Sequence, residues 1–166
     1  MRLNKNALIA AFVAVDVIVI DQILKWVVTD SLGMQLGQTI DVSPVFDLTY
    51  TLNTGVSFGM FSGGEARWAL TVFSLIVAGA MAWWALKAPR KLMGLALGLV
   101  IGGALGNVID RIRIGAVIDF LDFSAVHFPW IFNIADAGIS VGVALLVLDS
   151  LLSERKAPVG SAAQTE

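Results

Sequence analysis

Residues 102–136 constrain this chain most, because they place polar and charged side chains between two strongly apolar segments. Their sequence is GGALGNVIDRIRIGAVIDFLDFSAVHFPWIFNIAD. In a membrane, an unpaired charge is costly, so these side chains must pair with one another or carry out a function. The polar residues concerned are Asn107, Asp110, Arg111, Asp119, Asp122, Asn133 and Asp136.

The composition predicts an all-α membrane protein. Of the 166 residues, 57% are hydrophobic and only 14% are charged, whereas about a quarter of the residues of a soluble domain are charged. Four segments approach the length of about 20 residues that crosses a bilayer, namely residues 7–28, 68–86, 92–110 and 132–152. We therefore expect a four-transmembrane-helix bundle that forms a single integral membrane domain over residues 1–152. Residues 153–166 are polar and predict a disordered cytoplasmic tail.

Residues 29–67 form the only long polar region, and they predict a small β-sheet cradle between the first two spans. Residues 42–52 are rich in β-formers and indicate a short strand or hairpin. Glycine-containing turns are expected at Gly33, Gly37 and Gly55. The same region predicts a segment lying at the membrane interface, because aromatic and apolar side chains follow the last turn. These side chains are Phe58, Met60, Phe61 and Trp68.

The distribution of Lys and Arg predicts the orientation of the chain. The amino-terminal run resembles a signal peptide, but Asp16, Asp21 and Lys25 interrupt it and no clear cleavage site follows, so we expect a retained helix. Of the basic residues, seven then lie on the side of both termini and four on the other side. By the positive-inside rule both termini are cytoplasmic. Residues 29–67 and the 111–131 loop then face outward, and the aspartates lie near the outer leaflet surface.

The spacing of polar residues along the last two predicted spans places several of them on common faces. Asn107 and Arg111 are four residues apart, and Asn133 and Asp136 are three apart, so each pair shares a helix face. Asp136 falls about one turn inside its span and should face the bundle. The third span also carries small residues every four positions, which predicts close approach of another helix. These are Gly94, Gly98, Gly102 and Gly106.

Two carboxylates that meet in a half-dry site share one proton near neutral pH. One of them can then deprotonate a water while the other protonates a carbonyl oxygen, which is the chemistry of aspartic proteases. Asp119 and Asp136 can form such a pair if residues 120–135 fold back. From spacing alone, Asp110 and Asp122 are equally good candidates. Arg111 either forms a structural ion pair at a helix end or clamps a carboxylate or a lipid phosphate.

Other residues have simpler interpretations, and some chemistries are excluded. Asp21 and Lys25 are four apart and fit a helix-stabilising ion pair, and residues 53–55 (Asn-Thr-Gly) fit an ordinary turn. The absence of cysteine excludes disulfides, thiolate metal sites and a cysteine nucleophile. The single histidine, His127, excludes paired-histidine zinc motifs. A net charge of −2 provides no basic surface for nucleic acid.

Five blocks of this sequence, in the same order along the chain, closely resemble those of the lipoprotein signal peptidases, also called signal peptidase II. The blocks are DQILK (21–25), NTGVSF (53–58), GGALGNVIDR (102–111), VIDF (117–120) and FNIAD (132–136). The sequence departs from the family pattern at Val56 and Ser57, where two alanines are usual, and at Ala137, where Ser or Thr is common.

This resemblance implies a bacterial inner-membrane aspartic endopeptidase. Such an enzyme removes the signal peptide from a prolipoprotein by cleaving just before the diacylglyceryl-modified cysteine. The resemblance implies that Asp119 and Asp136 are the catalytic dyad. It also implies residues that position the dyad and the substrate, namely Asp21, Lys25, Asn53, Gly55, Asn107, Asp110, Arg111 and Asn133. The implied partners are the lipidated precursor and membrane lipids, with no cofactor, metal, nucleic acid or obligatory protein partner.

Two other functions fit intramembrane polar residues. A proton-coupled transporter would use the carboxylates as a relay, and it predicts polar residues along a path across the whole membrane. A non-enzymatic assembly factor would use the glycines and polar residues to bind other helices, and it predicts that Asp119→Asn is tolerated.

Overall fold

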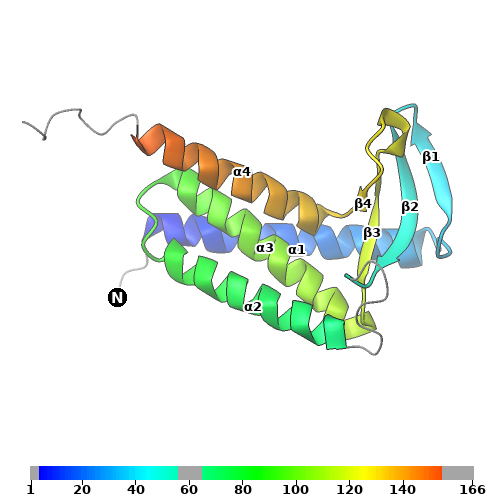
Figure 1. Ribbon diagram of the computed structural model, residues 1–166, viewed down its shortest axis with the longest axis horizontal. Helices are drawn as coiled ribbons and strands as arrows, with labels where there is room; N and C mark the ends of the chain where they lie inside the picture. The colour runs from blue at the N-terminus through cyan, green and yellow to red at the C-terminus, as the bar shows by residue number, and fades with distance from the viewer. Residues whose placement is uncertain (1–3, 56–64, 155–166) are drawn as a thin grey trace, which may run out of the picture.

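The computed structural model describes residues 4–55 and 65–154, and it shows four long helices with a small sheet across one end of the bundle (Figure 1). The helices are α1 (Lys5–Trp26), α2 (Glu65–Ala85), α3 (Lys91–Ile114) and α4 (Ile134–Glu154). A π-helical turn, η1 (Val27–Ser31), continues α1. Each of the four helices is long and apolar enough to cross a membrane, which confirms the prediction of four spans.

The ends of the predicted spans differ from the helices by a few residues. The largest difference is at α3, which we expected to end at residue 110 and which continues to Ile114. Gly115 then ends the helix in the left-handed conformation, with a φ of 85°. The hydropathic segment ends at the first charged residues, whereas the backbone hydrogen bonds of the helix continue past them. As a result, Arg111 lies on α3 and not in the predicted 111–131 loop.

Helix α3 lies at the centre of the bundle. In its apolar window 72% of the residues are buried, compared with 17–28% in the other three helices. Glycines allow α1 to pack directly on its backbone, as predicted: a Cβ added to Gly98 would lie 2.6 Å from the carbonyl oxygen of Ala10. A Cβ added to Gly102 would lie 2.7 Å from the carbonyl oxygen of Ala14. The close approach brings the polar groups of the next turns of both helices within hydrogen-bonding distance.

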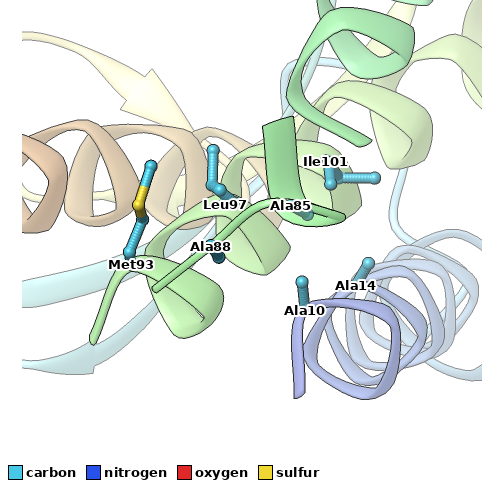
Figure 2. Close-up of a cluster of buried hydrophobic side chains, with 7 residues drawn as sticks. All are labelled: Ala10, Ala14, Ala85, Ala88, Met93, Leu97 and Ile101. Atoms are coloured by element: carbon cyan, nitrogen blue, oxygen red, sulfur yellow. The ribbon is translucent and has the colours of Figure 1, made fainter. Parts of the chain in front are cut away.

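Figure 2 shows an apolar core of the bundle near the connection between α2 and α3, which lies at the end opposite the sheet in Figure 1. Residues of α1 and α3, of the end of α2 and of the turn that follows it contribute to this core, namely Ala10, Ala14, Ala85, Ala88, Met93, Leu97 and Ile101. Polar contacts close this end of the molecule. Asn4 and Asn6 both donate to the carbonyl oxygen of Ala88, and Arg90 forms a bidentate pair with Asp149. The small side chains explain why the helices approach closely without large interdigitating residues.

The sheet contains four antiparallel strands in the order β1-β2-β3-β4. The strands are β1 (Thr39–Ser43), β2 (Phe46–Asn53), β3 (Val117–Asp122) and β4 (Ile131–Phe132). Strands β1 and β2 form a hairpin where residues 42–52 predicted a strand or hairpin. After β3, a short 3₁₀ helix η2 (Ser124–Val126) and strand β4 return the chain to α4. Residues 120–135 therefore fold back, which was the condition for Asp119 and Asp136 to meet.

An apolar cluster of Val28, Met34 and Phe120 joins the sheet to the end of α1. It fixes the position of β3 above the helices. The predicted interfacial segment lies mostly outside the described residues, and so do Phe58, Met60 and Phe61. Trp68, which we placed in that segment as well as at the start of the second span, lies on α2 with 55% of its surface exposed.

Candidate active site

Asp119 lies in the middle of β3, and only 1% of its surface is exposed. Each of its carboxylate oxygens accepts a hydrogen bond from an asparagine amide. Asn53, at the end of β2, donates to Oδ2 at 3.0 Å, and Asn133 donates to Oδ1 at 2.6 Å. The β2–β3 register explains the first contact, since Asn53 pairs with Val117, two residues before Asp119. The carboxylate is thus held by one residue that precedes Asp119 in the sequence and by one that follows it.

Asp136 lies in the first turn of α4, where the exposed N–H groups of the helix favour a negative charge. Asn133 precedes this helix and caps it, because its Oδ1 accepts a hydrogen bond from the backbone N–H of Asp136 at 2.9 Å. The side chain of Asp136 accepts from Nδ2 of Asn107 on α3 at 2.7 Å. The three-residue spacing of Asn133 and Asp136 therefore reflects a helix cap.

Two asparagines connect Asp119 with Asp136. The amide of Asn133 donates to Asp119 and also contacts Oδ1 of Asn107 at 3.2 Å, while Asn107 donates to Asp136. We call Asp119 and Asp136 the aspartate pair. Burial, followed by the negative charge of Asp136, raises the pKa of Asp119 to about 6. The structure therefore places the two carboxylates in one hydrogen-bonded network, where burial and the negative charge of Asp136 favour the protonated form of Asp119.

A second cluster of charged side chains lies next to the pair and contacts Asn107. It consists of Lys25, Asp21 and Asp110, and we call it the lysine cluster. The ammonium group of Lys25 lies 2.8 Å from Asp21 and 2.6 Å from Asp110. Its third contact is Oδ1 of Asn107 at 3.4 Å. An ammonium group has three donors, so all of them are used. At most 2% of the surface of any of the three side chains is exposed, so the predicted Asp21–Lys25 ion pair is a buried one.

The two acids of the lysine cluster also hold the segments that carry the aspartate pair. Asp21 accepts a hydrogen bond from the backbone N–H of Ala135 at 3.0 Å, and Asp110 accepts one from the N–H of Ile118 at 3.1 Å. Each contacted residue immediately precedes one member of the pair. The lysine cluster thus sets the distance between β3 and the start of α4, where the two carboxylates lie.

Arg111 was expected either to form a structural ion pair at the helix end or to clamp a carboxylate or a lipid phosphate, and its neighbour Asp110 pairs with Lys25. Within the described residues, no ion pair involves the guanidinium of Arg111. This half-buried group lies close enough to interact with the charges of Asp136, Asp110 and Asp119. Arg111 therefore lies next to the aspartate pair with donors that the described contacts do not use.

Gly55 supports the site through the turn that it forms with Asn53. Its φ is +77°, which favours glycine, and its backbone N–H donates to Oδ1 of Asn53 at 2.8 Å. This hydrogen bond leaves Nδ2 of Asn53 directed at Asp119. The turn predicted from residues 53–55 is therefore also what orients Asn53.

Asp122 is separate from the aspartate pair. It lies at the far end of β3, where Thr49 donates to its carboxylate at 2.7 Å and the N–H of Ser124 donates at 2.9 Å. These hydrogen bonds, that of Thr49 first, lower the pKa of Asp122. A carboxylate that is held ionised in this way does not share a proton. The structure thus distinguishes Asp119 from Asp122, which the spacing alone could not do.

Gln22 is a site residue to which we assigned no role from the sequence. Its amide donates to Asp110 at 3.0 Å and to the carbonyl oxygen of Gly106 at 3.3 Å. It follows Asp21 directly in the DQILK block, and that position was the only signal. In the described ranges 4–55 and 65–154, no group of three or more His, Cys, Asp or Glu side chains is arranged to hold a metal ion.

Comparison with known proteins identifies relatives along nearly the whole chain. The family model of signal peptidase (SPase) II matches residues 13–152. The lipoprotein signal peptidase of Caulobacter vibrioides is 45% identical over 93% of this chain and 93% of its own length. That of Sphingopyxis alaskensis is 43% identical over 83% of this chain and 82% of its own.

Solved structures show the same architecture. A bacterial membrane enzyme determined by the in meso method at 2.3 Å resolution superposes with a TM-score of 0.79. It is 29% identical, and the match covers 92% of this chain and 93% of that one. The sequence matches and the shared fold together show that the chain belongs to the signal peptidase II family.

Proposed function

We propose that this protein is an aspartic endopeptidase that removes the signal peptide from diacylglyceryl-modified prolipoproteins, cleaving before the lipidated cysteine. Its relatives are named lipoprotein signal peptidases, which supports the substrate class. The observation that carries the mechanism is the pair of asparagines, Asn107 and Asn133, that connects Asp119 with Asp136. Two carboxylates joined in this way can act as one acid and one base.

In the proposed mechanism, Asp119 acts as the acid and Asp136 as the base. Asp136 takes a proton from a water as its oxygen attacks the scissile carbonyl carbon, while Asp119 gives its proton to the carbonyl oxygen. The tetrahedral intermediate then collapses, which breaks the C–N bond. The amine leaves with the proton from Asp136, and a hydroxyl of the intermediate returns its proton to Asp119.

The remaining site residues position these groups. Asn53, held by Gly55, and Asn133 keep the carboxylate of Asp119 in one orientation, and Asn107 does the same for Asp136. Arg111 offsets the negative charge of the pair and offers donors to the substrate backbone. The lysine cluster fixes the two backbone segments. We propose no metal or cofactor for this reaction.

We further propose that both termini are cytoplasmic and that the sheet lies at the outer leaflet of the bacterial inner membrane. The sequence supports this orientation, because seven of its Lys and Arg residues fall on the predicted side of both termini and four on the other side. Residues 1–152 would form the single membrane domain and residues 153–166 a cytoplasmic tail. A transporter is less well supported, because the buried carboxylates of the described helices lie at the sheet end, apart from Asp149, which pairs with Arg90.

The substrate class is tested with two synthetic precursor peptides that differ only in the diacylglyceryl group on the cysteine. We expect the purified protein to cleave the lipidated peptide, because the lipid places the scissile bond at the depth of the aspartate pair. The unlipidated peptide should be cleaved at least about a hundredfold more slowly, since it lacks this positioning. Product masses give the cleavage site. Equal cleavage of both peptides would contradict the proposed substrate class.

The acidity of Asp119 predicts the pH dependence of cleavage. The pKa of Asp119 is raised to about 6, so the free enzyme loses the shared proton as the pH rises through this value. We expect kcat/KM to fall about tenfold per pH unit above that pKa, because the carbonyl oxygen then has no proton donor. The Asp122→Asn variant is the control and should give the same profile. A profile that is flat from about pH 5 to about pH 8 would exclude this assignment.

A further inference from the structure

A cavity of about 220 Å³ opens at the sheet end of the bundle, and neither member of the aspartate pair lines it. It lies between the last turns of α1 and α3, beside strand β2 and the start of β3. The lining residues that matter here are Gln22, Lys25, Trp26, Asp30, Tyr50 and Arg113. Several waters fit into this volume, since a water occupies about 30 Å³ in the liquid. It is smaller than the about 300–1,000 Å³ of pockets for drug-sized ligands.

The floor and the rim of the cavity differ in what they can bind. On the floor, Lys25 uses all three donors within the molecule, and Gln22 donates to Asp110 and Gly106. On the rim, the exposed guanidinium of Arg113 has one long contact, at 3.4 Å, with Oε1 of Gln22. Most of the donors of Arg113 are therefore available to a ligand.

The rim also carries a negative charge on a different element. Asp30 lies in η1, is exposed, and accepts a hydrogen bond from Oγ1 of Thr29 at 2.6 Å. Within the described residues it has no cationic partner within 4 Å. One free cation and one free anion therefore face the same small cavity from two different spans. A ligand that carries both charges complements them.

The surroundings of the cavity place it at the edge of a membrane. Trp26 and Ile114 line it, and 57% and 51% of their surfaces are exposed. Tryptophan is enriched at the boundary between lipid and water. Ile23 lies about one turn before Trp26 on α1 and is also more than half exposed, at 53%. Ile23 and Ile114 provide an apolar surface for hydrocarbon chains beside the polar rim.

We propose that this cavity binds a phosphoethanolamine group, carried by a phospholipid of the leaflet at the sheet end. Its phosphate binds the guanidinium of Arg113, which suits phosphate through its planar set of donors. Its ammonium group donates to the carboxylate of Asp30 and lies near the ring of Trp26, to which a cation is attracted. The acyl chains continue along the exposed isoleucines of α1 and α3.

The test measures lipid binding and does not depend on peptide cleavage. The delipidated protein in detergent is mixed with equal amounts of phosphatidylethanolamine, phosphatidylcholine and phosphatidylglycerol, and bound lipid is counted by native mass spectrometry. We expect phosphatidylethanolamine to be retained about tenfold over the other two, because its ammonium group offers charged N–H donors to Asp30. The headgroup of phosphatidylcholine has no N–H donor, and that of phosphatidylglycerol has hydroxyl groups but no positive charge. Equal retention of the three lipids would overturn the proposal.

Two variants and two matched controls identify the contacts. Arg113→Gln should lower retention of all three lipids about tenfold, since each loses a charge-assisted phosphate contact. Asp30→Asn should remove the preference for phosphatidylethanolamine over phosphatidylcholine. The controls are Lys91→Gln and Asp41→Asn, exposed residues of α3 and β1 outside the cavity, and they should behave like the unmodified protein. Retention that does not change in Arg113→Gln and Asp30→Asn would place the lipid elsewhere.

A soluble phosphoethanolamine would satisfy the same contacts, and a separate arm distinguishes this source. O-phosphoethanolamine alone is titrated against the lipid-free protein and its Arg113→Gln variant by isothermal calorimetry. If the natural ligand is the membrane lipid, O-phosphoethanolamine should bind at least about a hundredfold more weakly than the lipid, because it lacks the acyl-chain contacts. Binding as tight as that of the lipid would show that the soluble compound is the ligand, and it would overturn the lipid as the source.

Discussion

Replacement of Asp119 or Asp136 by asparagine will abolish measurable cleavage of a lipidated precursor. Each variant loses one of the two groups that exchange protons with the substrate and the water. General acid–base catalysis contributes about 10²- to 10⁴-fold per group, so we expect a loss of at least about a thousandfold in kcat/KM. Cleavage is followed by mass spectrometry with purified protein and a diacylglyceryl-modified peptide. Undiminished cleavage by either variant would remove that residue from the mechanism.

The structure supplies a matched control for this experiment on the same strand. Asp122 is also a buried carboxylate of β3, but Thr49 and Ser124 bind it and it does not contact the pair. We expect kcat/KM of the Asp122→Asn variant to stay within about threefold of that of the unmodified protein, because Asp122 takes no part in the proposed reaction. All three variants should keep the thermal unfolding midpoint close to that of the unmodified protein. A similar loss of cleavage in all three would indicate a structural effect on β3.

The sequence was sufficient to predict the membrane-spanning part of the fold. Length and hydropathy determine whether a helix spans a bilayer, and both are local properties. The four-residue repeat of glycines likewise predicted close helix packing, and Gly98 and Gly102 lie against the backbone of α1. Helix α3 runs beyond the predicted span because hydropathy registers the charge at residue 110, whereas Gly115 ends the helix.

The contacts of the site could be predicted only in part. Pairs three or four residues apart on one helix, such as Asp21 with Lys25, follow from helix geometry, whereas Asn133 precedes α4 and caps it. The contact of Asp110 with Lys25 connects residues on two helices, and nothing in their spacing favours Lys25 over the neighbouring Arg111. The same holds for Asn53 and Asp119, whose contact depends on the register of β2 and β3. Only the family resemblance singled out Asp119 before the structure showed its surroundings.

Replacement of Lys25 by methionine will cause a larger loss of stability than removal of any exposed ion pair. The ammonium group lies between two carboxylates that are at least 98% buried, and methionine would leave both without a counter-charge. Breaking a buried pair in this way lowers the free energy of unfolding by about 3–5 kcal/mol. Thermal unfolding in detergent, followed by tryptophan fluorescence, measures the change. The Arg90→Met variant is the comparison and should lose less stability than Lys25→Met, because 47% of the surface of that arginine is exposed and only one carboxylate loses its partner.

A triple variant separates the effect of charge from that of packing. Lys25→Met combined with Asp21→Asn and Asp110→Asn leaves no buried charge in the lysine cluster. The asparagine oxygens can still accept the backbone hydrogen bonds of Ala135 and Ile118 that the aspartates accept. We expect the triple variant to recover most of the stability lost by Lys25→Met alone, since a buried ionic group removed as a whole is often nearly neutral. If the triple variant is less stable than the single one, the two carboxylates stabilise the fold even without the ammonium group, and uncompensated charge does not explain the loss in Lys25→Met.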